Sequence, residues 1–373
     1  MPDGESPRRS IDEAALLLTC LCGLPFLVPQ DVDWRALLEL ASAHGVLLLI
    51  HQSFLRNGVE MPELFAGAVR EHKKNAEKYA DELARLLQQF GQRGIEVIPL
   101  KGPALAETLY SDATLRSCDD LDMLVRRQDF SNAEKALSDM GFAARAEADD
   151  YHRKFLGKDV MVELHFGVAS PRSFPFDIAG VWNRSRSVTF GGQPARAMSE
   201  EDLILFLCLH GLKHGFSRLI WIMDVACALA KMRNGIEEFA QSARRQGLEQ
   251  PLLIACEMVR EALPQKLPSE ISALIATSPE AMGKAQDAVA HLFAQRAGAN
   301  NDPEIWRFYL QMESGVRQRW RRRLSFLIPT AEDYAWARRH QIHRGVVPVL
   351  RPFRLLRKYG PLRVWQILFP PGV

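Results

Sequence analysis

The chain has 373 residues, of which 47% are hydrophobic and 25% are charged, and its formal net charge is +2 at pH 7. This length exceeds the usual size of one hydrophobic core and predicts two or three subdomains, while the ordinary composition excludes disordered and fibrous classes. The six cysteines are scattered, without paired CxxC spacing or a dense disulfide framework, so we expect a reducing, cytoplasmic setting.

Residues 1–91 are predicted to be helical. One helix covers Ile11 to Leu21, a second helical segment begins at Trp34, and a long run starts at Pro62 and closes with glycines. The apolar stretch ALLLTCLCGLPFLV is too short to span a bilayer and follows acidic residues, whereas a signal peptide begins with positive charge. We therefore expect a buried first helix and no membrane span.

Residues 92–195 are predicted to form a compact α/β module. The run IEVIPL favours a strand, GPALAETLY a short helix, LDMLV a strand, QDFSNAEKALSDMGF a helix, and VMVELHFGV another strand. The helical pattern then returns over residues 196–316, beginning at Ser199, which with Asp202 has the spacing of a capping box.

Residues 317–373 form a basic segment that is also predicted to be helical. From Arg317 to Arg363, thirteen Lys or Arg residues stand against two acids, so this stretch carries +11 and the remainder of the chain −9. Such asymmetry indicates an anionic partner, or alternatively a solvated or internally paired basic surface.

The stretch LRSCDDLDMLV places Asp119, Asp120 and Asp122 at the mouth of a buried strand. Because side chains alternate along a strand, Asp120 and Asp122 should share one face while Leu121 and Met123 take the other. Two carboxylates in one space raise each other's pKa unless a cation lies between them, and Mg²⁺ or Mn²⁺ suits hard oxygen ligands. The alternative is that the aspartates merely cap the strand entrance.

Residues on both sides of this motif add to the metal hypothesis. Lys101 and Gly102 precede a helix whose first amides can bind a phosphate. Glu163, in step with His165 on the later strand, supplies the third carboxylate that a two-metal transfer site would need.

A second group of polar residues follows Ser199. His210, His214, Ser217, Trp221 and Asp224 recur every three or four residues and so share a helical face. With Lys213 at its edge and Arg218 near the next turn, this face either neutralises a departing pyrophosphate or packs as a hydrogen-bonded interface.

The order of strand, Lys-Gly, helix, RSCDDLDMLV, helix and VELH resembles the largely uncharacterised nucleotidyltransferase family of the DNA polymerase beta superfamily. The resemblance implies an α+β fold, with a small mixed-sheet core between helical N- and C-terminal regions. It implies that Asp120, Asp122 and Glu163 bind two Mg²⁺ or Mn²⁺ ions. Residues expected near the triphosphate are Lys101, Gly102 and Arg116, with Lys213 and Arg218 as further candidates.

The implied activity moves a nucleoside monophosphate from an NTP, most simply ATP, to an unidentified small-molecule, peptide or protein acceptor. Two departures bear on the rate: Lys101-Gly102 replaces the superfamily's usual Gly-Ser, and Glu163 replaces its more familiar Asp. The alternatives are a nucleotide-binding or interaction protein that kept the fold and lost turnover, and an RNA-binding protein that uses the basic C-terminal segment.

Overall fold

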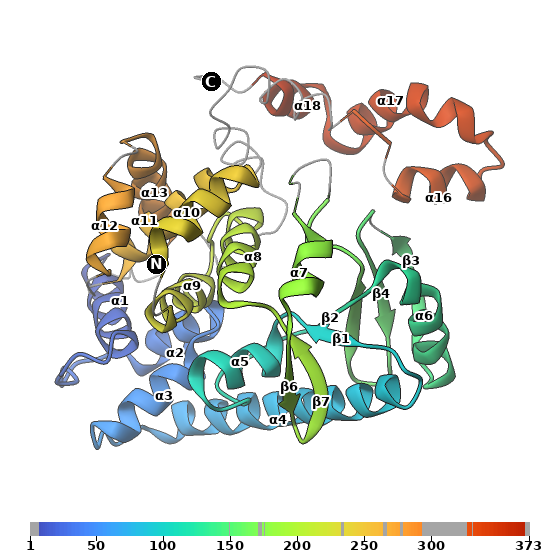
Figure 1. Cartoon of the computed structure of the whole chain (residues 1–373). Coiled ribbons are helices and arrows are strands. Elements are labelled where there is room, and N and C mark those ends of the chain that lie inside the picture. The colour runs from blue at the N-terminus through green and yellow to red at the C-terminus, as the bar shows by residue number, and fades with distance from the viewer. Residues whose placement is uncertain are drawn as a thin grey trace, which may run out of the picture.

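The computed structural model of the chain describes residues 7–148, 150–170, 174, 176–232, 235–263, 267–276, 279–292, 327–329 and 331–369. Its fold is α+β, as predicted: a small mixed sheet lies between helices from both ends of the chain (Figure 1). No helix among these residues is both long and apolar enough to cross a bilayer.

Four helices precede the sheet. They are α1 (Pro7–Leu21), α2 (Trp34–Ala43), α3 (Leu47–Arg56) and α4 (Glu63–Gly91). The Asp33 carboxylate caps α2 by accepting from the amides of Arg35 and Ala36 at 3.0 and 3.1 Å. The apolar run after Trp34 is not one helix, because Gly45 adopts φ +71° and turns the chain between α2 and α3.

The central sheet has five strands in the order β1-β2-β5-β4-β3. The strands are β1 (Val97–Pro99), β2 (Leu121–Val125), β3 (Ala143–Ala148), β4 (His152–Leu156) and β5 (Met161–His165). β2 and β5 are parallel, and the other neighbouring pairs are antiparallel. Helices α5 (Gly102–Tyr110) and α6 (Phe130–Asp139) lie between strands in the chain, where the sequence predicts them.

The two faces of the sheet belong to two hydrophobic cores. Met123 and Leu164 point into a core shared with α4 and α6, where Leu86 and Leu137 are fully buried. Leu124, on the other face, joins a larger core formed mainly by the helical regions. The polar residues of the central strands lie on this second face, between the sheet and the helices that follow it.

A hairpin and a run of helices follow the sheet. The hairpin strands β6 (Arg186–Phe190) and β7 (Gln193–Ala197) flank Gly191 and Gly192, which form the turn between them. The helices are α7 (Ile178–Arg184), α8 (Glu200–Lys213), α9 (Leu219–Lys231), α10 (Ile236–Arg245), α11 (Glu249–Ala262), α12 (Ser269–Ile275) and α13 (Pro279–Leu292). Ser199 caps α8 by accepting from the Asp202 amide at 3.2 Å, as its spacing predicts.

Three helices lie in the described part of the C-terminal segment. They are α16 (Ala331–Arg339), α17 (Val347–Tyr359) and α18 (Pro361–Leu368), drawn in red in Figure 1. The arginines from Arg317 to Arg323 lie outside the described residues.

Candidate active site

The site begins with a cross-strand row of charged residues on one face of the sheet. Asp122 of β2 lies opposite Glu163 of β5, which lies opposite Lys154 of β4. In the next row, His165 of β5 lies opposite His152 of β4. Strand register therefore brings together side chains more than forty residues apart, because in-register neighbours on one face lie about 5 Å apart.

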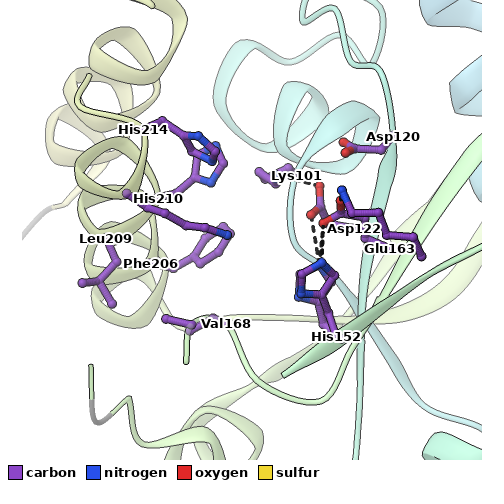
Figure 2. A pocket seen from close by; sticks show the side chains of 14 residues that line it. Lys101, Asp120, Asp122, His152, Glu163, Val168, Phe206, Leu209, His210 and His214 are labelled. Atoms are coloured by element: carbon purple, nitrogen blue, oxygen red, sulfur yellow. Dashed lines mark hydrogen bonds and ion pairs between the residues drawn. The ribbon is translucent and has the colours of Figure 1, made fainter. Parts of the chain in front are cut away.

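Each carboxylate in this row has a basic partner. Lys101 Nζ lies 2.9 Å from Asp122 Oδ2, and Lys154 Nζ lies 2.6 Å from Glu163 Oε1. His165 Nε2 lies between the two acids, 3.1 Å from Asp122 Oδ1 and 3.4 Å from Glu163 Oε2. Figure 2 shows Asp122 and Glu163 of this cluster on one side of a cavity.

The opposite wall of the cavity comes from α8. Phe206, Leu209, His210, Lys213 and His214 line it, and Figure 2 shows His210 and His214 facing the acids across the cavity. Lys213 donates a hydrogen bond to the Tyr151 hydroxyl beside β4. The cavity thus has an acidic and basic wall from the sheet and, from α8, a wall that combines two imidazoles and one ammonium group with apolar side chains.

Asp120 lines the same cavity just before β2, so Asp120 and Asp122 share a face as strand alternation predicts. Asp119 points elsewhere and its side chain is 87% exposed. Burial, followed by repulsion from Asp122, raises the pKa of Asp120 to about 7. Among these acids, Asp120 is the one whose ionised form the protein disfavours.

The neighbouring acids have lowered pKa values. Burial alone would raise the pKa of Asp122, but the Lys101 ammonium and the His165 hydrogen bond outweigh it and lower this pKa to about 2. Burial also opposes ionisation of Glu163, yet His165 and Lys154 lower its pKa below the usual range. Both groups are therefore held as carboxylates, the form that binds cations.

The donor atoms needed for a metal ion are close together here. One ligand atom from each of Asp122, Glu163 and His165 falls within a cluster whose members are no more than 4.8 Å apart. Two carboxylates and an imidazole fit a divalent ion. Asp120 contributes a further carboxylate to the same cavity.

The structure brings only some of the predicted phosphate-binding residues to this cavity. Lys101 and Lys213 line it, and Gly102 adopts φ +62° at the start of α5, directly after Lys101. Arg116 is buried, and its Nε lies 3.0 Å from Asp224 Oδ2. Arg218 Nη1 lies 4.0 Å from Asp119 Oδ2. Neither arginine lines the cavity, and the roles assigned to all five residues remain predictions.

The single helical face predicted after Ser199 does not form, because α8 ends at Lys213 and α9 begins at Leu219. His210 and His214 reach the cavity and pack on Trp221, with ring centroids 5.5 and 4.9 Å away. Burial, followed by the charge of Lys101, lowers the pKa of His210 well below its usual value, so its ring is neutral. Asp224 instead faces away, holding Arg116 and accepting from the Tyr110 hydroxyl at 2.8 Å.

Sequence reasoning did not identify His152, Lys154 or His165 as members of the site. His165 could have been found, because it stands two residues after Glu163 and alternation puts both on one face. His152 and Lys154 had no such signal, since their strand was not predicted.

The chain is similar to one known protein family and, at low sequence identity, to solved structures. The pattern of the uncharacterised nucleotidyltransferase family matches residues 30–264. A search of curated proteins finds no match. Among solved structures, the antibiotic-resistance factor ANT(2'')-Ia in solution is 16% identical, with a TM-score of 0.37 over 46% of this chain and 96% of its own. An antigenic nucleotidyltransferase-like protein from Paracoccidioides brasiliensis is 18% identical, with a TM-score of 0.37 over 53% of this chain and 96% of its own.

Proposed function

Because the chain belongs to the uncharacterised nucleotidyltransferase family, we propose that it transfers a nucleoside monophosphate from an NTP to an acceptor and releases pyrophosphate. ATP is the first candidate donor, and the acceptor is a small molecule, a peptide or a protein. The observation that carries the proposal is the cavity in which Asp120, Asp122 and Glu163 meet three lysine ammonium groups.

We assign the metal to the acids. Asp120, Asp122 and Glu163 would hold Mg²⁺ or Mn²⁺, which when bound polarises the triphosphate, lowers the pKa of the acceptor and offsets charge on the leaving group. The lowered pKa values of Asp122 and Glu163 support this assignment, because both groups are already ionised at neutral pH.

The lysines would bind and orient the triphosphate. Lys101 and Lys154 are held at the sheet by Asp122 and Glu163, and Lys213 approaches from α8 on the other side of the cavity. Ammonium groups on both sides of one cavity can contact phosphate oxygens at two points and so fix the direction of the chain of phosphates. The neutral His210 adds no competing positive charge to this wall.

The test is a panel of NTPs with Mg²⁺ or Mn²⁺, read by pyrophosphate release and by mass shifts in candidate acceptors. Asp122→Asn should abolish release, whereas the matched Asp119→Asn, at an exposed position in the same stretch, should retain it. Nucleotide binding without release for every NTP would instead favour an interaction protein that retains the fold. Equal loss in both variants would contradict the assigned metal role of Asp122.

A further inference from the structure

A backbone contact orients the ring of His165. Its Nδ1 lies 3.2 Å from the carbonyl oxygen of Gly167, and because a carbonyl can only accept, Nδ1 carries the hydrogen. Nε2 points between Asp122 and Glu163 and donates to Asp122 Oδ1 at 3.1 Å in the metal-free protein, so a bound ion would take the place of this hydrogen. A metal-binding histidine typically has this arrangement, with its second nitrogen donating to a carbonyl or carboxylate.

The spacing of the donor atoms suits one ion. Cis ligands of an octahedral ion lie about 3 Å apart when each bond is about 2.1 Å. The distances from His165 Nε2 to Asp122 Oδ1 and Glu163 Oε2 are 3.1 and 3.4 Å, close to this value.

Lys101 and Lys154 leave Asp122 Oδ1 and Glu163 Oε2 facing His165. Lys101 contacts Asp122 through Oδ2 and Lys154 contacts Glu163 through Oε1, which are the carboxylate oxygens turned away from His165. Outer hydrogen bonds of this kind fix the orientation of ligating carboxylates.

We infer that Asp122, Glu163 and His165 form a mixed oxygen and nitrogen site that selects a first-row transition ion, such as Mn²⁺, over Mg²⁺. The inference deepens the proposed function, on which it rests for the presence of a divalent ion. Mg²⁺ favours oxygen ligands and keeps much of its water, whereas an imidazole nitrogen favours transition ions. Because all three ligands come from the protein, this site fills before nucleotide arrives.

Mn²⁺ binding without nucleotide tests the inference directly. Electron paramagnetic resonance measures affinity, and spin-echo modulation from ¹⁴N detects a bound imidazole. The wild type should show ¹⁴N modulation; His165→Gln should lose it and bind Mn²⁺ about tenfold or more weakly, with a smaller change for Mg²⁺. The matched variant His152→Gln removes the ring stacked 4.8 Å from His165 and should keep the modulation.

Absence of ¹⁴N modulation in the wild type, or its persistence in His165→Gln, would overturn the inference. If His165→Gln fails to fold, the ¹⁴N measurement on the wild type alone tests the inference. A protein with ¹⁴N-coupled Mn²⁺ that releases no pyrophosphate from any NTP would keep this site and lose the proposed function. Pyrophosphate release with bound Mn²⁺ that shows no ¹⁴N coupling would keep the proposed function and overturn this metal site.

A second inference comes from the C-terminal helices. Val347 and Leu355 on one side of α17 are buried, whereas Val349 and Phe353 on the other side are each 65% exposed. On α18, Leu362 is 71% and Trp365 is 60% exposed. Single exposed apolar residues are ordinary, but two successive helices that expose several are characteristic of an interaction surface.

Basic residues accompany these apolar side chains. Arg351 and Arg354 pair with Asp333, which is buried, and so have an internal role. The remaining basic residues of described side-chain exposure on α16–α18 and their connections lie at the surface: Arg338, Arg339, Arg344, Arg357 and Lys358. On α17, Arg357 follows Phe353 by four residues and so shares its exposed helical face, which is therefore both cationic and apolar.

We propose that α17 and α18 bind an anionic lipid surface. Phosphate groups alone would explain a use for the cations but not for exposed Phe353 and Trp365, whereas an anionic bilayer interface accommodates both kinds of side chain. The anionic partner predicted for residues 317–373 is therefore an anionic lipid in this proposal.

Cosedimentation of the full chain with phosphatidylcholine vesicles, with and without phosphatidylserine, tests this. We expect binding only with phosphatidylserine, weakened by salt, and lost in Phe353→Ser/Trp365→Ser and in Arg357→Glu/Lys358→Glu. Leu27→Ser, at a site that is 92% exposed in the N-terminal region, is the matched control and should bind normally. No vesicle binding, equal binding to neutral vesicles, or binding to RNA alone would overturn the proposal.

Discussion

Two aspartates separated by one residue should respond to the same substitution with opposite signs. Asp120→Asn should stabilise the metal-free protein, because burial and the neighbouring Asp122 raise the pKa of Asp120 to about 7. Asp122→Asn should destabilise it, because Lys101 and His165 lower the pKa of Asp122 to about 2. Both variants should lose metal-dependent turnover.

The size of each change in stability follows from the pKa shift of the aspartate concerned. Raising an acid's pKa from 3.8 to about 7 corresponds to at most about 4 kcal/mol against the ionised form. Because the native state then holds the proton more tightly, wild-type stability falls as pH rises from about 4 to about 7, and Asp120→Asn avoids that fall. For Asp122 the lowered pKa stabilises the fold above pH 4 and this contribution is lost toward pH 2. Removing its charge leaves Lys101 buried without its partner, at a cost of about 3 kcal/mol.

Urea denaturation from pH 4.5 to 8 without divalent ions measures both effects, with Asp119→Asn as the exposed control. The gain from Asp120→Asn should be largest at pH 8 and shrink toward pH 4. A gain that is absent at pH 8, or that grows as pH falls, would refute the electrostatic account of Asp120. Equal stability changes in Asp120→Asn and Asp122→Asn would refute the distinction between them.

Two further substitutions test the contacts beyond the acids. Lys213→Ala should weaken NTP binding in a folded protein, because Lys213 lines the cavity from α8; unchanged affinity by calorimetry would give it a structural role beside Tyr151. Asp224→Ala should lower the free energy of unfolding by about 3–5 kcal/mol, since it leaves the buried Arg116 unpaired. Arg116→Met/Asp224→Leu should recover most of that loss, and a fall in NTP affinity in this double variant would instead support the predicted contact of Arg116 with the triphosphate.

Local patterns predicted the elements that carry the acids. The β-branched run before Lys101, the apolar alternation after Asp120 and the segment around Glu163 each specify a strand, and all three strands form. The predicted α/β module was incomplete, because Ala143–Ala148 is mostly Ala, which is depleted in strands, and His152–Leu156 opens with three basic residues and shows no apolar alternation. These strands form because β4 pairs with β5 and β3 pairs with β4, contacts that sequence periodicity does not reveal.

The partners of the charged residues were harder to predict than their positions. Arg116 and Asp224 are 108 residues apart, and only the packing of α5 and α9 brings them together. Lys101 likewise contacts Asp122 because β1 and β2 are antiparallel neighbours. A single sequence indicates which side chains share one face of a helix or strand. It does not indicate which other element packs against that face.

The register between β2 and β5 also determines where this chain can tolerate insertions and deletions. Asp122 faces Glu163, while their neighbours Met123 and Leu164 point into the opposite core and are fully buried. One residue inserted within β5 ahead of Glu163 would turn its carboxylate into that core and present an apolar side chain to the cavity. The same insertion near Gly157, in the turn between β4 and β5, can be absorbed by the loop. Length variation is therefore expected to be confined to this turn and excluded from the strand.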